Sequence, residues 1–106
     1  MQKDKKKAVL ELLSKIPKGK VVTYKQISDF LDINSPQFVG KILGNNPDPS
    51  KYPCHRVVYR DGKLSPKYSF GGEKAQKKKL EEEGVRFSGD RVDLKRSLYL
   101  FVGTPR

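Results

Sequence analysis

The sequence predicts a mainly α-helical single domain of 106 residues that carries one small β-hairpin. Three observations support this prediction. Apolar residues recur at helical spacing near the N-terminus, helix-capping patterns open two further segments, and the clearest strand-like stretch is short and contains an Asp-Gly turn. A chain of this length is expected to form one domain with a core of modest size.

The N-terminal part is predicted to begin with two helices. Residues 3–16 place apolar side chains on one face and lysines on the other, which is typical of a surface helix, and the following Pro-Lys-Gly ends it. After a short extended segment, Thr23 and Gln26 form a capping box. This pattern predicts a second helix that ends near Leu31.

A third helix is expected over residues 36–44, with Ser35 as the N-cap and proline at the first helical position. Two short helices joined by a tight polar turn are typical of a helix-turn-helix, although such hairpins also occur in proteins without a DNA partner. The second helix of the pair would be the recognition helix. It would present Gln37 and Lys41 outward, while Phe38 fits either an outward position or the core.

The C-terminal part is predicted to complete a winged helix-turn-helix-like domain over the whole chain. Residues 57–64 are interpreted as the β-hairpin, which would be the wing. Residues 65–72 form a loop whose final Gly-Gly permits unusual backbone angles. Residues 74–83 form a highly charged helix closed by Gly84, and a last helix covers about residues 93–98.

The net charge of +11 indicates a polyanionic partner. Nucleic acid is the leading candidate because each lysine or arginine that approaches a phosphate releases counterions. A solubilising lysine coat and an anionic membrane surface are the alternatives. No apolar run is long enough to span a membrane, and the lysine-rich start lacks the apolar stretch of a secretory signal.

The only cysteine and the only histidine of the chain are adjacent, at Cys54 and His55. A thiolate is a strong nucleophile, and neighbouring cationic groups lower the pKa of a thiol. Adjacent side chains point in different directions, so His55 would take the thiol proton through a water and would itself need an orienting carboxylate. The residues leave several carboxylates open for that role: Asp61, Glu81, Glu82 and Glu83. The alternative is a buried apolar Cys54 beside an ordinary surface His55.

The cysteine count also bears on compartment and cofactors. A single cysteine cannot form an internal disulfide, so we expect a reducing compartment. One cysteine and one histidine are too few ligands for a structural zinc site. We therefore expect neither a metal nor another cofactor.

Several short motifs follow one another in a fixed order between Ile16 and Gly84: Thr23-Tyr24, Asn46-Pro47, Pro53-Cys54-His55-Arg56-Val57, Tyr68-Ser69, Gly71-Gly72 and Glu83-Gly84. In this order they resemble the C-terminal, DNA-binding domain of the O6-alkylguanine-DNA alkyltransferases, also called methylated-DNA–protein-cysteine methyltransferases. The Pro-Cys-His-Arg-Val motif is the most specific part of the resemblance. The N-terminal domain often found in that family is expected to be absent.

The resemblance implies DNA repair by a single-turnover S-methyltransferase. A methyl or other alkyl group would pass once from O6-alkylguanine to Cys54, after the damaged base has flipped out of the duplex. His55 would deprotonate the thiol through a bound water, and Glu83 would hold His55. Asn46 would order the turn that follows the recognition helix, and Tyr24 would lie near the flipped base.

The resemblance also implies the binding residues. Tyr68 and Ser69 would close the pocket over the base, and main-chain groups at Cys54 and Val57 would read the edge of the base. The expected DNA contacts are Ser35, Gln37, Phe38, Lys41 and Arg56. Arg56 also suits a structural role that ties the active-site turn to the scaffold. The expected partner is double-stranded DNA containing O6-alkylguanine, bound through its minor groove by a monomer in a prokaryotic cytoplasm, with no membrane involved.

Four positions depart from the family pattern. Gln37 replaces an arginine that fills the gap left by the extruded base, Phe38 replaces a small alanine, Pro36 replaces another small residue, and Phe70 intrudes before the Gly-Gly of the pocket loop. Gln37 could still hydrogen-bond the orphaned cytosine, and Phe38 could act as an apolar wedge or pack in the core.

Two alternative functions stay open. One is an alkyltransferase-like protein that senses alkylated guanine without repairing it; such proteins typically carry tryptophan at the position of Cys54, so the thiol favours transfer. The other is a winged-helix DNA-binding protein whose cysteine is incidental.

Overall fold

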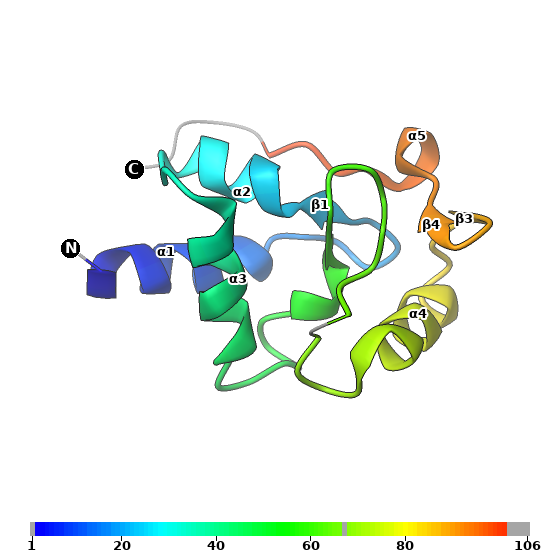
Figure 1. Ribbon diagram of the computed structural model, residues 1–106, viewed down its shortest axis with the longest axis horizontal. Coiled ribbons are helices and arrows are strands. Elements are labelled where there is room, and N and C mark those ends of the chain that lie inside the picture. The colour runs from blue at the N-terminus through cyan, green and yellow to red at the C-terminus, as the bar shows by residue number, and fades with distance from the viewer. Residues whose placement is uncertain (1, 67, 102–106) are drawn as a thin grey trace.

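The computed structural model describes residues 2–66 and 68–101, so residues 1, 67 and 102–106 of the predicted domain lie outside it (Figure 1). Within the described residues there are five α-helices: α1 (Gln2–Leu13), α2 (Tyr24–Phe30), α3 (Pro36–Gly44), α4 (Gly72–Glu82) and α5 (Leu94–Ser97). One 3₁₀ turn, η1, covers Cys54–Arg56. There are four two-residue strands: β1 (Val22–Thr23), β2 (Val57–Val58), β3 (Phe87–Ser88) and β4 (Arg91–Val92). The predicted mainly helical fold is confirmed, and no described helix has the length and apolarity needed to cross a membrane.

The helix-turn-helix consists of α2 and α3, which pack against each other (Figure 1). The predicted capping box opens α2: the Thr23 hydroxyl accepts from the Gln26 backbone N–H at 3.0 Å, and the Gln26 side chain accepts from the Thr23 N–H at 2.8 Å. The N-cap of α3 is Ser35, as predicted, but its hydroxyl lies 2.7 Å from Gln37 Oε1 instead of bonding the helix backbone. The start of α3 is therefore fixed by proline at its first position.

The predicted β-hairpin over residues 57–64 is wrong in position. The strand β2 pairs in parallel with β1, and the antiparallel hairpin is formed later by β3 and β4. Only the tight turn exists at the predicted place, where the Tyr59 N–H donates to the Lys63 carbonyl at 2.9 Å. Beyond that turn, Lys63 bridges to Arg91 instead of extending a ladder with β2.

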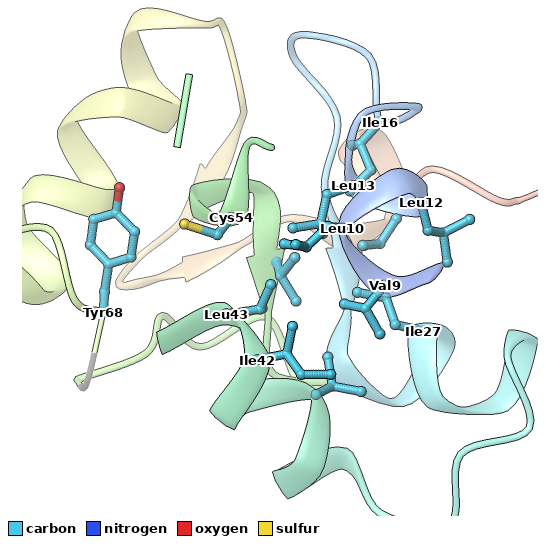
Figure 2. Packing of buried hydrophobic residues seen from close by; sticks show 13 residues of the cluster. Val9, Leu10, Leu12, Leu13, Ile16, Ile27, Ile42, Leu43, Cys54 and Tyr68 are labelled. Carbon is cyan, nitrogen blue, oxygen red and sulfur yellow. The ribbon is translucent and has the colours of Figure 1, made fainter. Parts of the chain in front are cut away.

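The paired strands β1 and β2 separate two apolar clusters. Side chains of a strand alternate between its faces, and here Val22 and Val57 join the larger cluster while Val21 and Val58 join the smaller one. All four are fully buried. Helices α1, α2 and α3 supply most of the larger cluster (Figure 2), and α4 and β4 cover the smaller one. Because β2 is packed on both faces, the η1 turn immediately before it is held in place beside the two clusters.

Candidate active site around Cys54

The η1 turn presents Cys54 at the edge of the larger cluster. The Cys54 N–H donates to the Tyr52 carbonyl at 2.7 Å, and the Arg56 N–H donates to the Pro53 carbonyl at 3.0 Å. Figure 2 shows the Cys54 sulfur directed toward Tyr68 and away from the aliphatic side chains. The residue is 4% exposed, so its thiol is accessible only through the cavity that it lines.

That cavity has a volume of about 700 Å³ and lies between the helix-turn-helix and the loop before α4. Cavities of roughly 300–1,000 Å³ accommodate small organic ligands, so this one has room for a nucleobase. The polar side chains that line it are Tyr24, Gln37, Lys41, Asn45, Tyr59, Ser65, Tyr68 and Ser69. Ser69 also donates its hydroxyl to the Gly44 carbonyl at 3.1 Å, which connects the loop to the end of α3.

Two phenols in the cavity are hydrogen-bond donors at neutral pH. Burial raises the pKa of Tyr24 above its ordinary value, and a hydrogen bond with Ser65 opposes that effect only in part. The Tyr24 ring lies 5.4 Å from that of Tyr59, centroid to centroid, at a tilt of 39°. Burial also raises the pKa of Tyr68, against a hydrogen bond from Lys79. Both phenols therefore keep their protons.

On the other side of η1, Glu83 joins His55 and Arg56. The His55 Nε2 lies 2.9 Å from Glu83 Oε2, and Arg56 donates to both oxygens of the carboxylate, at 2.9 Å from Nε and 2.7 Å from Nη2. Arg56 also donates to the Ile16 carbonyl at 2.8 Å. The predicted pairing of Glu83 with His55 is confirmed. Arg56, expected among the DNA contacts, instead bonds Glu83 and the Ile16 carbonyl, and these contacts fit the structural role that was the alternative for it.

The charge state of this cluster fixes the imidazole tautomer. Burial acts to raise the pKa of Glu83, but hydrogen bonds from Arg56 and His55 outweigh it and hold that pKa below its usual value. Burial lowers the pKa of His55, although the bond to Glu83 opposes the shift. An ionised Glu83 beside a neutral His55 must accept the Nε2 proton, because a carboxylate only accepts. The lone pair of the imidazole then lies on Nδ1, where it can act as a base.

The thiol needs such a base. Burial raises the pKa of Cys54, while a hydrogen bond with Asn46 and the charge of Lys79 act in the opposite direction. Cys54 and His55 line different hollows: His55 opens to a second one, of about 460 Å³, together with Glu83 and Lys79. This placement fits the expectation that neighbouring side chains diverge.

Asn46 fixes the chain between α3 and η1, as expected. Its Nδ2 donates to the Tyr52 carbonyl at 2.7 Å, and its Oδ1 accepts from the Asp48 N–H at 2.9 Å. The Tyr52 carbonyl is also the acceptor for the Cys54 N–H. One buried amide thus sets the backbone that carries the thiol.

Sequence reasoning missed Gln76, which is 1% exposed and lies on α4. Its Nε2 donates to the carbonyls of His55 at 3.1 Å and Val57 at 3.0 Å, and its Oε1 accepts from the Ser65 N–H at 3.0 Å. The signal available in the sequence was its spacing of four from Leu80, which puts an amide on the apolar face of a charged helix.

The remaining predicted residues divide between the cavity and the core. Gln37 and Lys41 are exposed at the cavity wall, and Ser35 beside them is half-buried. Phe38 packs against the larger cluster, which is its core interpretation. Val57 is fully buried; its N–H bonds to the Cys54 carbonyl and its carbonyl accepts from Gln76, so the structure places it away from the cavity lining.

Comparison with known families identifies the family of this chain. Residues 4–85 match the family described as 6-O-methylguanine DNA methyltransferase, DNA binding domain. The chain belongs to this family. The chain is 40% identical over 81 residues to the methylated-DNA–protein-cysteine methyltransferase of Methanothermobacter thermautotrophicus and 46% identical over 79 residues to that of Saccharolobus solfataricus. Those alignments cover 76% and 74% of this chain but 44% and 50% of the relatives, so the chain spans about half their length.

Of three further matches, the first two cover most of the matched protein as well as most of this chain. A DNA base-flipping protein of Vibrio parahaemolyticus is 42% identical over 82 residues, 76% of this chain and 79% of that protein. The structure of S. pombe Atl1, solved in complex with damaged DNA containing O6-carboxymethylguanine, superposes with a TM-score of 0.78 at 28% identity and covers 92% and 95% of the two chains. The structure of the O6-methylguanine-DNA methyltransferase of Pyrococcus kodakaraensis superposes with a TM-score of 0.66 at 41% identity, and the match covers 76% of this chain and 46% of that one.

Proposed function

We propose that this protein repairs DNA by accepting one alkyl group from O6-alkylguanine on Cys54. One observation carries the proposal: the sole thiol of the chain lines a cavity with room for a nucleobase, while the adjacent imidazole is held by a carboxylate at 2.9 Å. Family membership and the methyltransferase names of the relatives support it.

The first step is engagement of the duplex. The strongly basic chain binds phosphates, and α3 enters the minor groove with Gln37 and Lys41 toward the DNA. Extrusion of the damaged base costs a few kcal/mol, which contacts in the cavity offset. Since Phe38 packs in the core, Gln37 is the residue that occupies the gap in the duplex.

The second step is displacement at a saturated carbon. A bound water carries the Cys54 proton to His55 Nδ1, and Glu83 stabilises the imidazolium. The thiolate attacks the alkyl carbon, a carbon–sulfur bond forms, and the carbon–O6 bond breaks with its electron pair left on the guanine. The Tyr24 phenol protonates the departing base, and solvent returns the imidazolium proton to the phenolate. The products are guanine and a thioether with no hydrolytic route back, so each molecule acts once.

A second candidate is damage sensing without transfer. It is favoured by the near-complete superposition on Atl1 bound to damaged DNA and by the match to a DNA base-flipping protein, both of which share most of their length with this chain. Retention of Cys54 favours transfer over this alternative.

Intact-mass spectrometry after incubation with an O6-methylguanine oligonucleotide separates the candidates. Transfer predicts a gain of one methyl group per chain, absent with undamaged DNA and absent in Cys54→Ala. Tight binding of the damaged oligonucleotide with no gain in mass would establish the sensor and reject transfer. Sequence-specific binding of undamaged DNA would reject both.

A further inference from the structure

The mechanism above does not use Lys79, a half-buried lysine of α4. Its Nζ donates to the Tyr68 hydroxyl at 3.0 Å and lies 5.5 Å from the centroid of the Tyr68 ring. Lys79 lines the hollow that contains His55 and Glu83, whereas Tyr68 lines the cavity of Cys54. The Lys79–Tyr68 pair therefore connects the two sides of the η1 turn.

The hydrogen bond between these side chains has a fixed direction. An ammonium group only donates, so the Tyr68 oxygen must accept, and its own O–H is free to donate elsewhere. Burial raises the pKa of Tyr68, so that proton is retained at neutral pH. The Cys54 sulfur is directed toward Tyr68 (Figure 2), and a thiolate is an acceptor that such a donor stabilises.

We propose that Lys79 is a positioning residue for the thiol: it holds the Tyr68 hydroxyl as a donor in the Cys54 cavity and sets a positive charge behind it. This assignment gives the proposed transfer reaction a second means of forming the thiolate besides His55, and in that sense it rests on the proposed function.

Other groups near the Cys54 thiol act differently. Tyr24 on α2 is a neutral phenol, Asn46 supplies a hydrogen bond from the α3–η1 turn, and the neighbouring His55 is neutral and paired with Glu83. Lys41 on α3 lines the same cavity but is exposed, so solvent screens its charge, whereas the charge of half-buried Lys79 lowers the pKa of the Cys54 thiol. Loss of the Lys79 charge is therefore expected to raise the pKa of the Cys54 thiol, whereas loss of an exposed lysine is not.

The test measures the rate of Cys54 alkylation by iodoacetamide as a function of pH, without DNA. For Lys79→Met we expect the midpoint of the profile to rise by about one pH unit, which is about a tenfold slower reaction at pH 7. Lys79→Arg should restore the wild-type profile. Lys78→Met, which removes the same charge from the exposed neighbouring residue, should leave the midpoint in place.

Tyr68→Phe tests the same connection from the other side, because it keeps the ring and removes the hydroxyl. Its midpoint should rise, and the double variant with Lys79→Met should rise by less than the sum of the two single shifts. The proposal fails if Lys79→Met leaves the midpoint unchanged or if Lys78→Met moves it equally. Because iodoacetamide requires no DNA, absence of methyl transfer from DNA would reject the proposed function alone, while an unmoved midpoint would reject the role of Lys79 alone.

Discussion

The two sides of the η1 turn use their polar groups in different ways. On one side, Arg56 and His55 both bond Glu83, and the side chains of Arg56, Glu83 and His55 are 15%, 12% and 10% exposed. On the other side, Cys54 and the Tyr24 phenol face a cavity of about 700 Å³. We call Arg56, Glu83 and His55 the closed network; the other side of η1 is an open cavity.

In the proposed mechanism, this difference separates the residues that set the reactivity of the thiol from the residues that receive the damaged base. Breaking a buried ion pair leaves an uncompensated charge, so the Arg56–Glu83 pair is costly to disturb and holds the imidazole in one place. Gln37 and Lys41 at the rim of the cavity are exposed, so substitutions there disturb no buried ion pair. Substitutions in the closed network should therefore change rates and stability, whereas substitutions at the cavity rim should change binding.

The largest effect is expected from His55→Ala. Loss of the general base should slow alkyl uptake by at least about 100-fold, with DNA affinity nearly unchanged, because the main-chain carbonyl that Gln76 bonds is retained. Glu83→Gln, which keeps the size of the side chain, should slow uptake less. Rates from intact mass and affinities from fluorescence anisotropy check this directly. Equal losses of rate and affinity would contradict the division between the two sides.

The next effect concerns stability. Gln76→Leu keeps the volume of the side chain but leaves two carbonyls and one N–H without their partner, so we expect a loss of about 3 kcal/mol in the free energy of unfolding. Urea denaturation measures it. Lys78→Leu on the exposed face of α4 is the matched control and should change stability by less than about 0.5 kcal/mol. Similar values for both variants would show that Gln76 does not hold the turn.

A smaller effect should appear on acidification. The pKa values of His55 and Glu83 are both below their ordinary values, so the unfolded chain binds more protons than the folded one as the pH falls. For His55 the resulting stability is present above pH about 6.5, its ordinary value, and declines below it, whereas for Glu83 the decline begins only below pH about 4.3. The urea concentration at the midpoint of unfolding should decrease as the pH is lowered from about 7.5 to about 5, because the ordinary histidine pKa lies in that range. His55→Gln, which cannot titrate, should flatten the decline; a midpoint that rises on acidification would contradict the lowered pKa of His55.

The local parts of the fold could be predicted from the sequence, and the non-local parts could not. The Thr23 capping box and the proline start of α3 are properties of a few consecutive residues, and both are present. The strand at Val57 was recognised, but its partner was not. A parallel partner lies far along the chain, and nothing in the local pattern distinguishes it from a hairpin.

The site shows the same limit. Adjacent Cys54 and His55 indicated chemistry by their residue types alone, but the choice of Glu83 among several carboxylates came only from the family resemblance, and the structure supplies the distance that supports it. Gln76 and Lys79 lie on a helix rich in charge, and no role was predicted for either of them. Their importance depends on which face α4 turns toward η1, and that orientation is set by packing.

The smallest effect is expected at the cavity rim. Gln37→Arg adds a charged donor where Gln37 lines the cavity. Affinity for damaged DNA should therefore rise on the order of fivefold, which is about 1 kcal/mol. Affinity for undamaged DNA should rise by less. Asn34→Arg is the matched control: it adds the same charge in the exposed turn before α3, outside the cavity lining, and should strengthen both complexes equally. The rate of alkyl transfer from the bound complex should stay unchanged in both variants, because neither touches the closed network. A faster bound-state rate in Gln37→Arg would mean that the rim also governs chemistry, and the separation of the two sides of η1 would fail at that residue.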